Sequence, residues 1–264
     1  MVLVDIRETP SAKAADIFLQ VRPGKDFEVL TTLRALIKGQ PVDAAAVAET
    51  GLTLEQLQDL AQRMKTARFG VLFFGMGLSM TRGKHMNSAA ALTLAAELNA
   101  FTKFVAMPMR GHGNVTGADV VLRYTTAYPF GVSLTRGYPR FNPGEFSTID
   151  LLVRGDNDAT LVLGADPGAT MPQPAIEHLR RTPTIVLDPK VTYTSRLARV
   201  HITTAATGIS APGTVYRMDE IPLPLRPILR SPYPTDEEVV RRIRQTIQQR
   251  HGGFLPTAAH LQLA

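Results

Sequence analysis

The sequence predicts an α/β protein with a mainly parallel β-sheet covered by helices. Short apolar runs at residues 69–74, 159–164 and 184–187 have the length of buried strands. Segments with helical spacing separate these runs, and such alternation is typical of parallel sheets. The 264 residues are 44% hydrophobic and 20% charged, which indicates a folded globular chain and not a disordered one.

Residues 1–66 are predicted to form a mostly helical element. Residues 2–6 are apolar enough for an edge strand that joins another chain or sheet. Apolar positions then recur with helical spacing from residue 26 to about residue 38, where Gly39 ends the pattern. Thr53 and Gln56 have the spacing of a capping box, which opens a helix that runs to about residue 67.

Residues 67–202 are predicted to form the α/β core. A buried strand at 69–74 is followed by a glycine-rich turn, a helix from about 86 to 99 and a second strand at 101–107. A helical stretch near 173–180 separates the two later strands. The core is therefore expected to be Rossmann-like, with helices on both faces of the sheet.

Residues 203–264 are predicted to form an extended proline-rich segment followed by a basic helix. Pro212, Pro222, Pro224 and Pro227 interrupt any regular pattern, so we expect this segment to wrap over the core or over a neighbouring subunit. A second capping box at 235–238 begins the helix.

The net charge of +6 indicates either a solvated helix face with ordinary surface arginines or a surface for an acidic ligand or acidic partner subunits, and it favours nucleic acid less. Aromatic content is only 6%, there is no tryptophan, and no nucleic-acid-binding motif is present. No apolar run reaches the roughly 18 residues that a membrane span needs, and residues 1–16 lack a signal-peptide pattern. A cytoplasmic protein is expected.

A glycine-rich turn after the first core strand resembles two phosphate-binding motifs without completing either. Gly75 and Gly77 lie where a dinucleotide fingerprint begins, but Met80 replaces its third glycine. Gly83 and Lys84 are one residue too far from Gly77 for a phosphate loop, and a histidine follows instead of Ser or Thr. Gly75, Gly77 and Lys84 remain candidates for seating an anion, with a purely structural turn as the alternative.

Two later stretches are irregular, polar and rich in glycine and proline. The first, residues 107–117, contains Arg110, His112 and Asn114, and the second, residues 136–144, contains Arg136 and Arg140. Such loops bring hydrogen-bond donors together at a ligand or a partner. None of the six histidines has zinc-ligand spacing, and no G-x-S-x-G motif is present, so no catalytic residue is predicted.

The chain contains no cysteine, so it supplies no thiolate for an iron–sulfur cluster, a metal or a nucleophile. Several motifs nevertheless resemble those of the B subunit of formylmethanofuran dehydrogenase, a branch of the molybdopterin oxidoreductase superfamily. They cover nearly the whole chain in order: 19–26, 74–78 with 83–85, 108–117, 136–140, 142–145, 166–168, 187–190 and 213–219.

This resemblance implies a truncated molybdopterin-oxidoreductase fold. In that family an N-terminal region carries the cluster cysteines and then a cysteine or selenocysteine that binds tungsten or molybdenum, and this chain starts downstream of both. Ala198–Arg199 also replaces a common Ala-Asp pair. The family's active-site arginine falls among Arg110, Arg136 and Arg140, without assignment to one of them.

The resemblance therefore implies the B subunit of the bacterial formyltransferase/hydrolase complex, with its metal and cluster sites lost. In such a complex the A, C and D subunits move a formyl group from tetrahydromethanopterin to a methanofuran-type carrier and hydrolyse it to formate. We expect a non-catalytic structural subunit of this hetero-oligomer, without a cofactor of its own. The alternatives are a subunit that still binds a pterin or the carrier tail in a vestigial cleft, and a stand-alone Rossmann-type enzyme.

Overall fold

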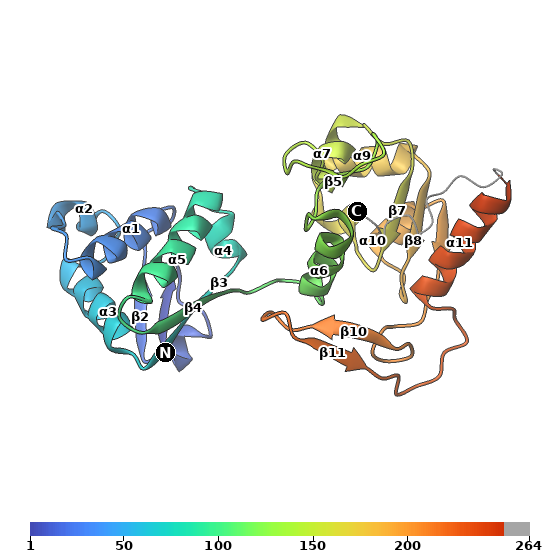
Figure 1. Ribbon diagram of the computed structural model, residues 1–264. Coiled ribbons are helices and arrows are strands. Elements are labelled where there is room, and N and C mark those ends of the chain that lie inside the picture. The colour runs from blue at the N-terminus through green and yellow to red at the C-terminus, as the bar shows by residue number, and fades with distance from the viewer. Residues whose placement is uncertain (251–264) are drawn as a thin grey trace. The chain divides into compact units, whose positions relative to one another are not determined.

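The computed structural model describes residues 1–250, and these divide into two compact units, unit 1 (residues 1–113) and unit 2 (residues 114–250) (Figure 1). The predicted boundaries at residues 66 and 202 do not coincide with this division. The reason is that the predicted helical region and the first core strands share one hydrophobic core.

Unit 1 combines two small parallel sheets with five helices and one 3-10 turn. Its elements in chain order are β1 (Val2–Asp5), η1 (Ala12–Ala14), β2 (Ile17–Gln20), α1 (Asp26–Ile37), α2 (Ala44–Ala48), α3 (Leu54–Thr66), β3 (Phe69–Phe74), α4 (Met76–Ser79), α5 (His85–Leu98) and β4 (Lys103–Pro108). Strand β1 pairs with β2, and β3 pairs with β4 in register Phe69 to Lys103. The predicted edge strand at residues 2–6 thus pairs within its own chain.

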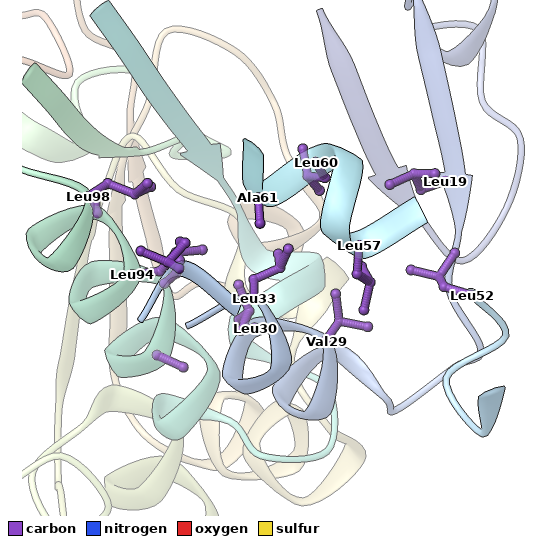
Figure 2. Close-up of a cluster of buried hydrophobic side chains, with 14 of the residues drawn as sticks. Leu19, Val29, Leu30, Leu33, Leu52, Leu57, Leu60, Ala61, Leu94 and Leu98 are labelled. Carbon is purple, nitrogen blue, oxygen red and sulfur yellow. The ribbon is translucent and has the colours of Figure 1, made fainter. Parts of the chain in front are cut away.

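The core of unit 1 lies between α1, α3 and α5 and one face of the strands. Leucines of the three helices point toward one another (Figure 2), among them Leu30, Leu33, Leu57, Leu60, Leu94 and Leu98. The capping box of Thr53 and Gln56 is confirmed, since each side chain accepts a hydrogen bond from the other residue's backbone N–H. Leu72, Phe74 and Ala106 pack against this core from β3 and β4.

Unit 2 contains a three-stranded parallel sheet, two antiparallel hairpins and six helices within the described residues. Its elements are α6 (Val115–Thr126), β5 (Val132–Ser133), β6 (Arg140–Phe141), α7 (Thr148–Arg154), β7 (Thr160–Leu163), α8 (Pro167–Thr170), α9 (Gln173–Arg181), β8 (Thr184–Leu187), α10 (Tyr193–Leu197), β9 (Val200–Ile202), β10 (Gly213–Tyr216), β11 (Pro222–Leu225) and α11 (Asp236–Arg250). The parallel sheet has the order β7-β8-β9.

The predicted strands, helices and mainly parallel pairing are confirmed, with two local corrections. The run at 69–74 is not buried on both faces, because only alternate residues face the core. The proline-rich segment contains the hairpin β10–β11, in which Tyr216 pairs with Pro222. The capping box at Thr235 and Glu238 begins α11 as predicted. No helix in residues 1–250 has the length and apolar character to cross a membrane.

Candidate functional site

The turn that follows β3 is organised by Asn87, a fully buried residue in the first turn of α5. Its Nδ2 donates to the carbonyl oxygen of Leu78 at 2.9 Å, to Thr81 Oγ1 at 3.2 Å and to the carbonyl oxygen of Arg82 at 2.9 Å. Its Oδ1 is buried and has no hydrogen-bond partner in the described residues. One side chain thus fixes the glycine-rich turn, and the sequence gives no local signal for this role.

Gly83 is required in this turn for two reasons. Its φ is +97°, a conformation that residues with a side chain rarely adopt, and a Cβ at this position would lie 2.4 Å from Asn87 Oδ1. Lys84 follows with φ of +44°, and its exposed side chain lies immediately before α5. The geometry of the turn therefore depends on its backbone conformation at Gly83 and Lys84.

Gly75 and Gly77, in contrast, are not required by neighbouring atoms. Gly75 precedes α4. The atom nearest to a Cβ added at Gly75 would be the carbonyl oxygen of Met109, at 3.6 Å. A Cβ on Gly77 would meet nothing within 4 Å. Open space around Gly77 is compatible with close approach of a ligand to the backbone.

A carboxylate, Asp26 of α1, supports the turn from the other side. Thr81 Oγ1 donates to Asp26 Oδ2 at 3.3 Å. Burial raises the pKa of Asp26 above its ordinary value, and the hydrogen bond from Thr81 only partly offsets this. Asp26 was not predicted as part of the turn, because it is distant in sequence.

The loop that follows β4 meets the turn after β3 at the carboxyl edge of the small sheet. The backbone N–H of Met109 donates to the carbonyl oxygen of Phe74 at 2.6 Å, and Met76 Sδ lies 3.5 Å from the position of a Cβ on Gly111. Arg110 and His112 are exposed residues of this loop. The carboxyl edge of a parallel sheet is a usual location for ligands in α/β proteins.

The remaining predicted residues belong to unit 2, where two of them have structural partners. Asn114 Nδ2 donates to the carbonyl oxygen of Thr214 and its Oδ1 accepts from the N–H of Tyr216, both at 2.9 Å, so it ties the start of α6 to β10. The Arg140 guanidinium lies 4.8 Å from the Phe146 ring centre and 3.2 Å from Thr135 Oγ1.

The predicted residues therefore fall into two groups. Gly75, Gly77, Lys84, Arg110 and His112 lie on the two adjoining loops of unit 1, whereas Asn114, Arg136 and Arg140 lie in unit 2, with Arg136 exposed. The first group offers cationic side chains and open backbone, which suit an anion. Residues 1–250 contain no group of three or more His, Asp or Glu side chains placed to hold a metal ion.

Comparison with known proteins shows which subunits this chain is similar to. The chain is 44% identical over 251 residues to the B subunit of the tungsten-containing formylmethanofuran dehydrogenase 2 of Methanocaldococcus jannaschii, and 41% identical over the same length to its counterpart in Methanococcus maripaludis. Each alignment covers 94% of this chain. The chain is therefore similar over nearly its whole length to B subunits of formylmethanofuran dehydrogenase. It spans 57% of the length of these two relatives, and no family model matches it.

Two solved structures confirm the molybdopterin-oxidoreductase fold. The crystal structure of the formyltransferase/hydrolase complex of Methylorubrum extorquens with methylofuran superposes with a TM-score of 0.70 and 22% identity, over 89% of this chain and 62% of that one. Acetylene hydratase of Pelobacter acetylenicus superposes with a TM-score of 0.66 and 14% identity, over 95% of this chain and 44% of that one.

The tungsten in the names of the archaeal relatives does not fit the donor set of this chain. The family resemblance implies a thiolate or selenolate ligand, and the 264 residues contain no cysteine. Asn87 Oδ1, a buried acceptor without a partner in the described residues, is a single neutral oxygen beside a tight turn and supplies no set of ligands. No chemical step through a metal held by these residues is therefore derived.

Proposed function

We propose that the chain is a non-catalytic structural subunit of a complex that transfers a formyl group to a methanofuran-type carrier and hydrolyses it to formate. The observation that carries this proposal is the lack of any thiol in a chain similar to these B subunits, because such a chain retains the fold but not the metal ligand that the dehydrogenases require. The proposed partners are A, C and D subunits, and the fold of the Methylorubrum extorquens complex supports this assembly.

The test is reconstitution of the complex with and without this chain. The A, C and D subunits of the same host are expressed together, and assembly and formate production from the formylated carrier are measured. Omission of the chain is expected to abolish both. Full assembly and an unchanged rate of formate release in its absence would contradict the structural role.

A second candidate function is favoured by the 44% identity to a tungsten-containing dehydrogenase subunit, of which this chain spans 57%. In this alternative the 264 residues work with a further polypeptide segment that supplies the metal ligands. The complex is purified from its host through a tag on this chain and analysed for tungsten, molybdenum and iron. Metal in proportion to the complex, together with reversible oxidation of the formylated carrier, would favour the dehydrogenase over the hydrolase.

We also propose that the two loops of unit 1 bind the acidic tail of the carrier. Lys84 and Arg110 are exposed cations on adjoining loops, and Gly77 leaves the backbone open. The variant Lys84→Glu is expected to weaken carrier binding by the assembled complex, measured by calorimetry, while Lys13→Glu on η1 leaves it unchanged. Equal affinities of the two variants would refute this role for the loops.

A further inference from the structure

One face of the β3–β4 sheet has no cover in unit 1. The side chains of Phe69 and Phe73 are 53% and 51% exposed, and those of Val71 and Val105 are 37% and 36% exposed. They alternate along the strands with core-facing residues such as Leu72. Helix α5 packs on the strands from the core side (Figure 1).

Such a face is unusual for parallel strands. Parallel sheets are almost always covered on both faces, and their residues are apolar on both sides for that reason. Here the sequence of β3 is apolar at every position except Gly70, yet only one of its faces packs on a core. A pair of strands is also marginal by itself. The outward face, defined here as Phe69, Val71, Phe73 and Val105, therefore has the composition of a buried surface.

The amino ends of the two strands carry cations beside this face. Lys103 Nζ lies 5.7 Å from the Phe69 ring centre, and Lys65 Nζ lies 4.4 Å from that of Phe101. Arg68 immediately precedes β3 and is exposed. Within residues 1–250 none of these three cations forms an ion pair. An apolar face with a basic border selects a partner that is apolar in its centre and acidic at one end.

We propose that the outward face of β3–β4 is the docking surface for an amphipathic segment of another subunit, whose apolar side chains cover the face and whose carboxylates meet Lys65, Arg68 and Lys103. This inference takes from the proposed function only that the chain works within a complex. It assigns the surface of contact and the chemistry of the segment that binds there.

The absence of native cysteine allows a direct test by thiol labelling. Phe73→Cys and the control Leu92→Cys each introduce a single thiol, at positions that are both 51% exposed in unit 1. Leu92 belongs to α5, which covers the opposite face. In the chain alone, both thiols are expected to react with a maleimide at similar rates. In the complex purified from the host, the thiol at position 73 is expected to react at least about ten-fold more slowly, because a buried interface excludes the reagent, while that at position 92 keeps its rate.

The segment that covers the face is identified by cross-linking. A photoreactive maleimide on Val71→Cys is expected to capture a peptide of another subunit that combines apolar and acidic residues. Lys103→Glu is expected to slow association and to reduce its dependence on salt, with Lys13→Glu as the control. Reaction at position 73 in the complex as fast as in the free chain would overturn the proposal. Capture of this chain's own residues or of a second copy would do the same. None of these measurements depends on formate production. Failure of the docking proposal can therefore be distinguished from failure of the proposed function.

Discussion

Two glycines of unit 1, Gly70 and Gly77, have opposite structural constraints. A Cβ on Gly70 would lie 2.0 Å from Cε2 of Phe104, whose ring is buried in the core, whereas Gly77 has no neighbour within 4 Å of that position. Gly70→Ala is therefore expected to destabilise the chain by about 1–3 kcal/mol through overpacking. Gly77→Ala is expected to change stability by less than about 0.5 kcal/mol. Urea unfolding measures both, and equal midpoints would contradict this assignment of the close contact.

A second prediction at the residue scale concerns the side-chain amide of Asn87. Asn87→Asp preserves the size of the side chain but replaces a donor that faces three oxygen atoms, those of Leu78, Thr81 and Arg82. Loss of these bonds in a buried site is expected to cost about 2–4 kcal/mol at neutral pH. The turn is then expected to lose protection, which hydrogen exchange of residues 78–84 measures. Retained protection would mean that the backbone alone holds the turn.

The local role of a residue was predictable only where it depends on a fixed interval to a second residue of a given type. The capping boxes at Thr53 and Thr235 rest on a three-residue interval, and both were predicted correctly. Asn87 has no such interval. Two of its three acceptors are backbone carbonyl oxygens, which any residue supplies, and the third is one hydroxyl. Asn114 was predicted as a binding residue from its polar loop, and the structure shows its amide bound to the backbone of β10. Whether any of the candidate residues, Asn114 included, binds a ligand stays a prediction.

At the scale of elements, α1 and α5 are joined by a charged cluster at one side of their apolar contact. Arg34 donates from Nε and Nη2 to the two carboxylate oxygens of Glu97, at 3.0 and 2.7 Å, and Lys38 Nζ lies 2.7 Å from Glu97 Oε1. The Glu97 side chain is only 17% exposed. Glu97→Gln is therefore expected to destabilise the chain by about 1–2 kcal/mol at pH 7, more than an exposed pair contributes.

This effect is expected to depend on pH. The hydrogen bond from Arg34 lowers the pKa of Glu97 below its ordinary value, against the opposing effect of burial. A carboxylate with a depressed folded-state pKa stabilises the fold above its unfolded pKa, about 4.3, and loses this contribution as the pH falls through the folded value. The difference in unfolding midpoint between the native chain and Glu97→Gln should thus shrink from pH 7 toward pH 3. Asp59→Asn, which breaks the exposed pair with Arg63, serves as the control with a small effect at every pH.

Strands and helices with clear apolar periodicity were predictable, whereas elements defined by pairing were not. Strand β3 and helix α5 follow from spacing alone. Strand β11 contains Pro222 and Pro224, which lack an N–H, so its sequence argues against a strand until its partner β10 is known. The exposed face of β3 was predicted as buried, since its sequence is apolar on both sides.

At the scale of the whole molecule, the sequence could not predict that the candidate residues divide between two compact units. Loops that converge on one sheet edge are distant along the chain, and composition gives no measure of their separation. The motifs in order did indicate a resemblance to formylmethanofuran dehydrogenase B subunits, and identities of 44% and 41% over 94% of the chain confirm that resemblance. Family resemblance therefore carried information about function that local physical chemistry did not.

Sulfur chemistry provides the last prediction, which concerns the whole chain. Tungsten and molybdenum in this family are expected on a thiolate or selenolate, and none of the 264 residues is a cysteine. The chain is expressed in medium with tungstate and molybdate, washed with a chelator and analysed by mass spectrometry for both metals and for iron. Metal contents equal to the buffer blank are expected, while the Methanocaldococcus jannaschii relative, prepared in parallel, retains tungsten. Stoichiometric tungsten on this chain would require ligands other than a cysteine thiolate and would contradict the structural role, because the chain would then carry a redox centre of its own.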